Sequence, residues 1–240
     1  MEVINKKQNQ ITFSAEVDES LANAIRRYVD QIPVLAADEV EISKNDSPLY
    51  DETIAHRIGM VPLKMEKGFN DKTEEQLVLV AKKDGIVYSG EMTGKVKLVH
   101  DRIPITVLKK GQELEIVAIA KVGKGSKHCK FSPGLMFYRN KMKIKIDKDC
   151  PKEVANVCPQ KILKSENGKV SVTDEKKCDM CEACTDLCRK MGKESIELIP
   201  TEELIITVES FGQIPEEEIF QGAIEALTED LKEVSKSISK

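Results

Sequence analysis

The 240-residue sequence predicts an α+β protein with a middle region dominated by short strands. Two segments repeat apolar residues at three- and four-residue steps, which is typical of helices, and several others alternate apolar and polar residues, which is typical of half-buried strands. The charge is balanced, with 37 Lys and Arg against 41 Asp and Glu, and the chain has no Trp, 4 Tyr and 6 Phe. This composition excludes a basic nucleic-acid-binding chain and disfavours base stacking on aromatic rings.

The N-terminal region predicts a strand followed by a helix. Residues 11–17 alternate apolar and polar side chains, and residues 6–9 suit a hairpin tip. Ser20 is a suitable N-cap for a helix that Pro33 ends. The apolar face of this helix consists of Leu21, Ala24, Ile25, Tyr28, Val29 and Ile32.

The middle of the chain predicts mostly antiparallel strands. Residues 34–42 have strand character, and residues 51–58 predict a short helix that ends at Gly59. Between residues 77 and 122, short apolar runs are separated by Gly and Asp turns. We therefore expect a β-rich region here, followed by a connector at residues 123–127.

Cysteine-bearing segments occur in two similar stretches between residues 141 and 191. Residues 144–146 lead to Cys150 and Cys158, as residues 170–172 lead to Cys178 and Cys188. Each stretch suits a strand, a cysteine loop, a helix and a second strand. Two such units in tandem predict a ferredoxin-like module.

The spacing of Cys178, Cys181 and Cys184 is typical of an iron–sulfur cluster, since three thiolates two residues apart can each reach a different iron. Cys158 precedes a proline, as the remote fourth ligand of such clusters does. The predicted ligand set is Cys158, Cys178, Cys181 and Cys184. The spacing leaves a three-iron or a four-iron cluster open, and Cys188 is the alternative to Cys158.

Other interpretations of the cysteines stay open. Zinc is one, although its sites usually have two separated Cys pairs, and a metal-free group of thiols is another. Cys150 and Cys188 have no assigned metal, because Glu153 and Asn156 occupy the positions where a second cluster needs cysteines. These two cysteines could be thiols or a disulfide.

The C-terminal region predicts a strand at residues 204–208, a break at Gly212 and a long helix after Pro215. Three glutamates at residues 216–218 favour the start of this helix, where its dipole is positive. Apolar residues follow at alternating steps of four and three, a seam by which one helix packs along another. They are Phe220, Ile224, Leu227, Leu231, Val234 and Ile238.

No catalytic constellation is found in the sequence. His128 and Cys129 are adjacent, but the other histidines are distant in sequence, and a loop histidine is the simpler interpretation. Phosphate-binding, dinucleotide-binding and hydrolase motifs are lacking. The N-terminal residues have no apolar signal core and no run approaches a membrane span, so we expect a cytoplasmic protein.

Three motifs resemble the alpha-like subunit family of DNA-directed RNA polymerases. Residues 20–27 (SLANAIRR) are similar to the first-helix motif of the bacterial alpha subunit. Residues 49–63 (LYDETIAHRIGMVPL) and 127–133 (KHCKFSP) resemble segments of archaeal and eukaryotic alpha-like subunits. With a ferredoxin-like insertion, the sequence resembles the archaeal branch of this family.

The resemblance implies an interleaved fold. Residues 1–40 and 194–240 would form a dimerisation domain, with a β-rich insert at 41–140 and an iron–sulfur domain at 141–193. The first and last helices would bind the small alpha-like subunit L, and this heterodimer would recruit subunits N and P and the large catalytic subunits. The implied partner contacts are Leu21, Ile25, Arg26, Arg27, Phe220, Ile224, Leu227, Leu231 and Val234.

By the same resemblance the chain is a non-catalytic subunit with no specific DNA contacts. Residues 51–57 are further candidates for partner contacts, although their charges and those of Arg26 and Arg27 could also pair within the chain. The cluster is expected to be structural, and a sensing role is also open. An alternative class is a ferredoxin-type electron-transfer subunit of an oxidoreductase, and a second is a scaffold that dimerises with itself through the last helix.

Overall fold

The computed structural model describes residues 1–166 and 168–239. The chain forms two compact units, each assembled from segments far apart in sequence. The first unit contains residues 1–7, 11–22 and 137–207, and the second contains residues 8–10, 23–136 and 208–240. The N-terminal segments therefore fold together with residues that follow them by more than a hundred positions.

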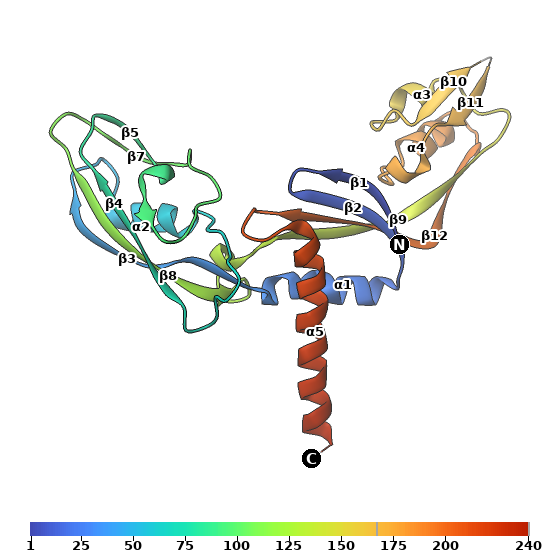
Figure 1. Ribbon diagram of the computed structural model, residues 1–240. Helices are drawn as coiled ribbons and strands as arrows, with labels where there is room; N and C mark the ends of the chain where they lie inside the picture. The colour runs from blue at the N-terminus through green and yellow to red at the C-terminus, as the bar shows by residue number, and fades with distance from the viewer. Residues whose placement is uncertain (167, 240) are drawn as a thin grey trace. The chain divides into compact units, whose positions relative to one another are not determined.

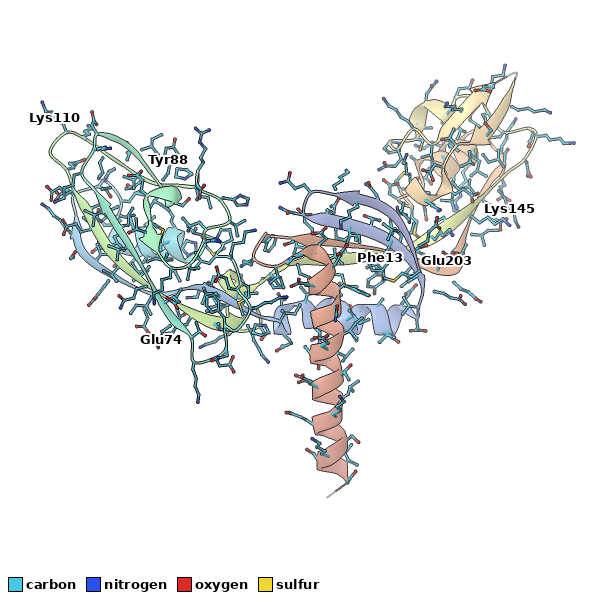
Figure 2. All side chains as sticks on the ribbon, viewed as in Figure 1. Phe13, Glu74, Tyr88, Lys110, Lys145 and Glu203 are labelled. Carbon is cyan, nitrogen blue, oxygen red and sulfur yellow. The ribbon has the colours of Figure 1, made fainter. Side chains whose placement is uncertain are left out.

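A four-stranded sheet organises the first unit (Figure 1). Its order is β1 (Glu2–Lys7), β2 (Gln10–Glu16), β12 (Ile196–Ser210) and β9 (Gly134–Ile146). The first two strands form the predicted hairpin, with Asn9 in the turn at φ 61°. Phe13 on β2 is buried, with 2% of its surface exposed (Figure 2). Strand β12 is much longer than the predicted 204–208, and residue 140, where a domain boundary was predicted, lies inside β9.

The cysteine-bearing region repeats one order of elements. The ends of β9 lead to α3 (Val154–Val157) and β10 (Leu163–Glu166), and β11 (Lys169–Val172) leads to α4 (Ala183–Lys190) and β12. Strands β10 and β11 pair antiparallel. A small core joins these elements and includes Met142, Ile144, Val154, Ile162, Leu163, Ile196 and four buried cysteines.

The second unit contains the β-rich middle region. One sheet has the order β3 (Pro33–Asn45), β8 (Leu114–Lys124), β4 (Glu74–Ala81) and β6 (Thr93–Gly94). A separate ribbon pairs β5 (Gly85–Tyr88) with β7 (Pro104–Leu108), and every one of these pairings is antiparallel, as predicted. Helix α2 (Asp51–Gly59) ends at the predicted glycine and buries Ile54 and Ile58 completely in the core of this region.

The first helix of the chain follows the N-terminal hairpin. Helix α1 (Glu19–Tyr28) continues as a 3-10 turn at Val29–Gln31 and stops before Pro33. The prediction of Ser20 as its N-cap was wrong. The Asp18 carboxylate accepts a hydrogen bond from the Ser20 backbone N–H at 2.8 Å, and the Asp18 carbonyl accepts one from the Ala22 N–H at 3.0 Å. An aspartate two residues earlier therefore caps the helix, and its negative charge suits the helix dipole.

Helix α5 (Glu216–Ile238) follows a turn in which Gly212 has φ +94°, a conformation that favours glycine. Pro215 lies at the N-cap with φ −61°. Ile219 and Ala223 are fully buried, and Gly222 lies beside the Ile32 side chain. The first two turns of α5 thus anchor it to its own unit.

Candidate functional site: a cysteine pocket and the exposed apolar face of helix α5

Cys158, Cys178, Cys181 and Cys184 line one small pocket in the first unit. Cys158 directly follows α3, and the other three cysteines lie before and in the first turn of α4. Ile144, Ile162, Leu163 and Leu198 supply an apolar wall. The fold therefore brings the predicted remote ligand next to the predicted run of three.

The backbone bends sharply between these cysteines. Met180 and Glu182 have positive φ values of 59° and 57°, a region that residues other than glycine seldom adopt. Local bonds support the bends, because the Cys181 N–H donates to the Asp179 carboxylate at 3.3 Å and the Thr185 hydroxyl donates to the Glu182 carbonyl at 2.8 Å. Left-handed residues at alternate positions allow a short loop to present several side chains to one point.

The four thiols of the cysteine pocket differ in their exposure to solvent. Cys178 and Cys184 are buried, Cys158 is partly exposed and Cys181 is exposed. Burial raises the pKa of the Cys184 thiol to about 11, so in the metal-free chain it carries its proton at neutral pH. A metal that binds here would displace this proton, because thiolates are the ligands of metals.

The residues present fit an iron–sulfur cluster in the kind and number of their donors. Among residues 1–166 and 168–239, no three Cys, His, Asp or Glu side chains are grouped closely enough to share one metal ion. A cluster does not require such a group, because each thiolate binds a different iron. The donor set is four soft thiols with an apolar surround, which suits iron–sulfur chemistry.

Cys150 and Cys188 lie outside the cysteine pocket. Both are buried free thiols, with 6% and 1% of their surfaces exposed. Burial raises the pKa of Cys150 to about 11, and the nearby Cys188 adds to this rise. The structure thus has them as neighbouring thiols, and the disulfide alternative is not formed.

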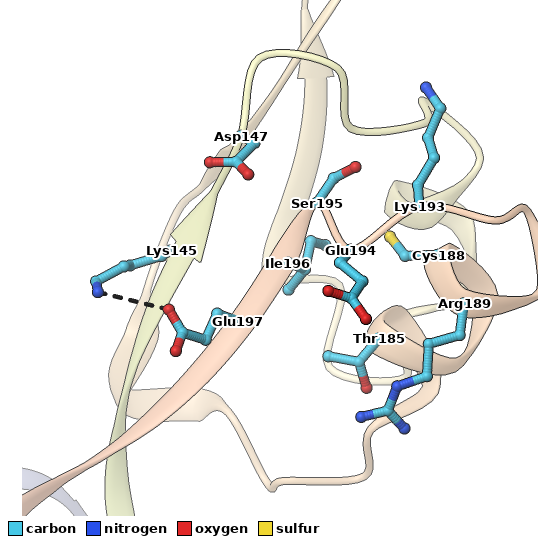
Figure 3. Close-up of a pocket in the computed structure, with 10 residues that line it drawn as sticks. All are labelled: Lys145, Asp147, Thr185, Cys188, Arg189, Lys193, Glu194, Ser195, Ile196 and Glu197. Carbon is cyan, nitrogen blue, oxygen red and sulfur yellow. Dashed lines mark hydrogen bonds and ion pairs between the residues drawn. The ribbon is translucent and has the colours of Figure 1, made fainter.

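Cys188 also lines a second, polar pocket of about 300 Å³, shown in Figure 3. Lys145 and Glu197 form an ion pair of 3.5 Å on one side of it, and Arg189 and Glu194 come from the other (Figure 3). The ion pair is exposed, so it contributes little to stability. Charges of both signs line this pocket.

The predicted seam on α5 is only partly covered. Leu231, Val234 and Ile238 have 60%, 54% and 80% of their surfaces exposed, and Ile224 has 38%. Phe220 and Leu227 are partly buried. Residues 228–239 contain no buried side chain. A helix with an apolar stripe in water is typical of a surface that another chain covers.

Helix α1 contributes differently from the prediction. Ile25 is 6% exposed and faces its own chain together with Ala22 and Val29, whereas Leu21 is 47% exposed. Of the four predicted contacts in this helix, Ile25 thus belongs to the chain's own core.

The charged candidates also have local partners. The Arg26 guanidinium donates two hydrogen bonds to the Asn23 side-chain oxygen, at 3.1 and 3.0 Å, and both it and Arg27 are exposed. Asp51 accepts a bond from Asn45 at 2.7 Å, and Arg57 donates one to the Ile105 carbonyl at 2.8 Å. Asp51 and Arg57 therefore already have hydrogen-bond partners within the chain, whereas Arg26 and Arg27 are accessible to a partner.

The histidine–cysteine pair has a structural role in part. The His128 ring nitrogen accepts the Lys130 N–H at 3.2 Å and so caps the 3-10 turn at Cys129–Phe131. Cys129 is exposed, and its sulfur lies 3.8 Å from the same ring nitrogen. This agrees with the simpler interpretation of His128 as a loop histidine.

Sequence patterns did not indicate Arg139, although its guanidinium donates to the backbone carbonyls of Lys176 and Cys178. A single arginine in a strand has no distinctive spacing, so no signal in the sequence could have identified it.

Across the described residues, no helix is both long and apolar enough to cross a membrane.

Comparison with known proteins identifies the family. Residues 40–137 match the RNA polymerase Rpb3/RpoA insert domain. The chain is 36% identical to DNA-directed RNA polymerase subunit Rpo3 of Pyrococcus furiosus, over 95% of this chain and 92% of the relative. It is 30% identical to the subunit Rpo3 of Archaeoglobus fulgidus, over 100% and 98% of the two chains.

A eukaryotic relative is similar over nearly the same length. It is subunit rpac1 of the DNA-directed RNA polymerases I and III of Dictyostelium discoideum, 29% identical over 99% of this chain and 81% of the relative. These matches define an alpha-like, non-catalytic subunit of a multi-subunit polymerase. Within that class, the chain belongs to the archaeal Rpo3 family of the Rpb3/RpoA type. The electron-transfer alternative is not favoured.

Proposed function

We propose that this chain pairs with the small alpha-like subunit L and that the heterodimer is the platform on which the polymerase assembles. The observation that carries this proposal is the apolar stripe of α5, with Leu231 and Val234 more than half exposed. Water-exposed Leu and Val side chains gain about 1.5–3 kcal/mol each on full burial. A second chain that supplies a matching helix would provide that burial.

The partner surface extends beyond α5. Arg26 and Arg27 of α1 add accessible guanidinium groups, and the exposed Leu21 of the same helix is a further predicted contact with the partner. Arginine binds carboxylates in a planar, two-pronged geometry that suits docking between subunits. Ile25 is the buried member of the predicted contacts, and Phe220, Ile224, Leu227, Leu231 and Val234 form the long stripe of α5.

The proposed assembly continues from this heterodimer. Residues 1–40 and 194–240 act as the dimerisation domain, 41–140 as the β-rich insert, and 141–193 as a ferredoxin-like domain. Subunits N and P and the large catalytic subunits then bind the platform in the cytoplasm. Seven free thiols suit a reducing compartment of this kind.

We also propose that Cys158, Cys178, Cys181 and Cys184 hold one iron–sulfur cluster, [4Fe-4S] or [3Fe-4S]. When bound, the cluster would cross-link the end of α3, the loop before α4 and the first turn of α4. The module has a small core, so such cross-links would contribute free energy of folding. The exposed Cys181 leaves one side of the site open to oxidants, which supports a sensing role beside the structural one.

Anaerobic co-expression with subunit L from the same source tests both proposals. Light scattering gives the stoichiometry, and the absorbance of the thiolate-to-iron charge transfer, with iron and zinc analysis, reports the metal. A brown one-to-one heterodimer is expected. A colourless heterodimer would contradict the cluster alone, a brown homodimer would contradict the partner alone, and zinc in place of iron would correct the identity of the metal.

A further inference from the structure

Arg139 lies on β9 and reaches the loop that carries the first cysteine of the run. One terminal nitrogen, Nη1, donates to the Cys178 carbonyl oxygen at 2.5 Å, and the other, Nη2, donates to the Lys176 carbonyl oxygen at 2.7 Å. Both bonds come from one planar group, so they fix the direction of the backbone from which the Cys178 side chain projects. Arg139 does not line the cysteine pocket itself.

Two other contacts hold the same segment. The Glu175 carboxylate accepts the Ile144 backbone N–H at 3.1 Å, and the Lys176 ammonium lies 2.8 Å from the Glu2 carboxylate. The second pair is largely exposed and contributes little. Arg139, in contrast, is partly buried and binds the backbone of a cysteine directly. It connects strand β9 to the start of the cysteine run.

The charge of Arg139 also acts on this site. Burial lowers its pKa, and the neighbouring Cys178 and Asp179 oppose that change, but a guanidinium keeps its proton in proteins. A fixed positive charge beside the site favours the reduced, more negative state of a cluster, and hydrogen bonds and charges of this kind set cluster potentials.

We propose that Arg139 is a positioning residue for the cysteine loop, holding Cys178 toward the pocket through two backbone carbonyls and placing a positive charge beside the metal site. The inference rests on the proposed cluster and goes beyond it, because it assigns a role to a residue that is not a ligand. Loss of such a supporting residue typically weakens metal binding by about 10- to 100-fold.

The test compares three variants of the full chain, each co-expressed with subunit L without oxygen. Arg139→Met removes the charge and both bonds, and Arg139→Lys keeps the charge but not the fork. Arg189→Met is the matched control, because Arg189 belongs to the same region but its side chain is 66% exposed and pairs with Asp186 on its own helix. Iron per chain, iron release to a chelator and the midpoint potential are measured.

We expect R139M to release iron about ten-fold faster than the wild type and to have a more negative potential. R139K should keep most of the potential while releasing iron faster, and R189M should match the wild type. If Arg139 only stabilised the fold, its replacement would lower stability without changing the midpoint potential. R139K keeps the positive charge, so it serves as the second variant if R139M folds poorly. Wild-type iron release and potential in both Arg139 variants would overturn this role alone, and a wild-type chain without iron would overturn the cluster as well.

Discussion

The Tyr28 hydroxyl, at the end of α1, donates a hydrogen bond of 2.9 Å to the Asp230 carboxylate in the second half of α5. The two residues are 202 positions apart in sequence. The bond lies on an exposed surface, beyond the buried anchors Ile219 and Ala223. It therefore restrains a part of α5 whose side chains are exposed from residue 228 to residue 239.

Removal of this bond should loosen the exposed part of α5. We expect Tyr28→Phe to increase amide hydrogen exchange in residues 226–234 while the exchange of β4 and β8 stays the same. Tyr50→Phe is the control, because the Tyr50 side chain is 82% exposed and belongs to the turn before α2. Equal exchange of α5 in all three proteins would contradict a restraining role for Tyr28.

The apolar stripe predicts a specific loss of heterodimer. Leu231→Asp with Val234→Asp should weaken binding to subunit L by more than about 100-fold, since two buried apolar side chains contribute about 3–6 kcal/mol. Stability of the isolated chain should not fall, because both residues are exposed in it. Lys232→Asp, which changes the charge beside the stripe, is the control. Isothermal titration calorimetry measures the affinities, and similar affinities for both variants would rule out α5 as the contact.

The ligand set predicts unequal effects of single cysteine replacements. Cys184→Ser should abolish the visible absorbance, and Cys158→Ser should lose at least one iron, because each removes a thiolate from the pocket. Cys188→Ser and Cys129→Ser should keep the iron content of the wild type. Iron analysis and electron paramagnetic resonance of anaerobic samples distinguish these results. Loss of iron in Cys188→Ser but not in Cys158→Ser would make Cys188, and not Cys158, the fourth ligand.

The ion pair of Asp38 and Lys130 predicts a pH-dependent contribution to stability. Its atoms lie 2.7 Å apart, and the Lys130 side chain is 14% exposed. The hydrogen bond from Lys130 lowers the pKa of Asp38, so the stabilisation is present above the ordinary pKa of an aspartate and is lost as pH falls through the lowered value. Asp38→Asn should cost about 0.5–1 kcal/mol at pH 7 and nothing near pH 2. Urea unfolding at both pH values measures this, with Asp84→Asn as an exposed control.

Much of the fold follows from local patterns. The short helix at residues 51–58 was predicted from its flanking turn and Gly59, and the antiparallel strands of the middle region from short apolar runs between Gly and Asp turns. The N-cap of α1 was misplaced, because Asp18 and Ser20 are both good caps and only the backbone geometry selects one. Strand β9 was recognised only at its end, since its alternation is interrupted by partly buried polar residues at 138–141.

In the candidate site too, local spacing predicted some residues and long-range packing decided the others. The spacing of Cys178, Cys181 and Cys184 identified a common site from sequence, because a loop of fixed length limits how far its thiols can separate. The place of Cys158 in the same pocket depends on the packing of α3 against α4, and Arg139 depends on the pairing of β9 with β12. Long-range pairing of this kind has no local signature.

The sequence by itself determined the family, the cysteine run and the apolar stripe of the last helix, since each depends on residues that are close together in the sequence. Only the tertiary structure decided which apolar residues are covered: Ile25 and Ala223 are buried within the chain, while Leu21, Leu231 and Val234 stay in water. The physical reason is that periodicity identifies an apolar face but not what it packs against, and burial depends on segments that meet from opposite ends of the chain.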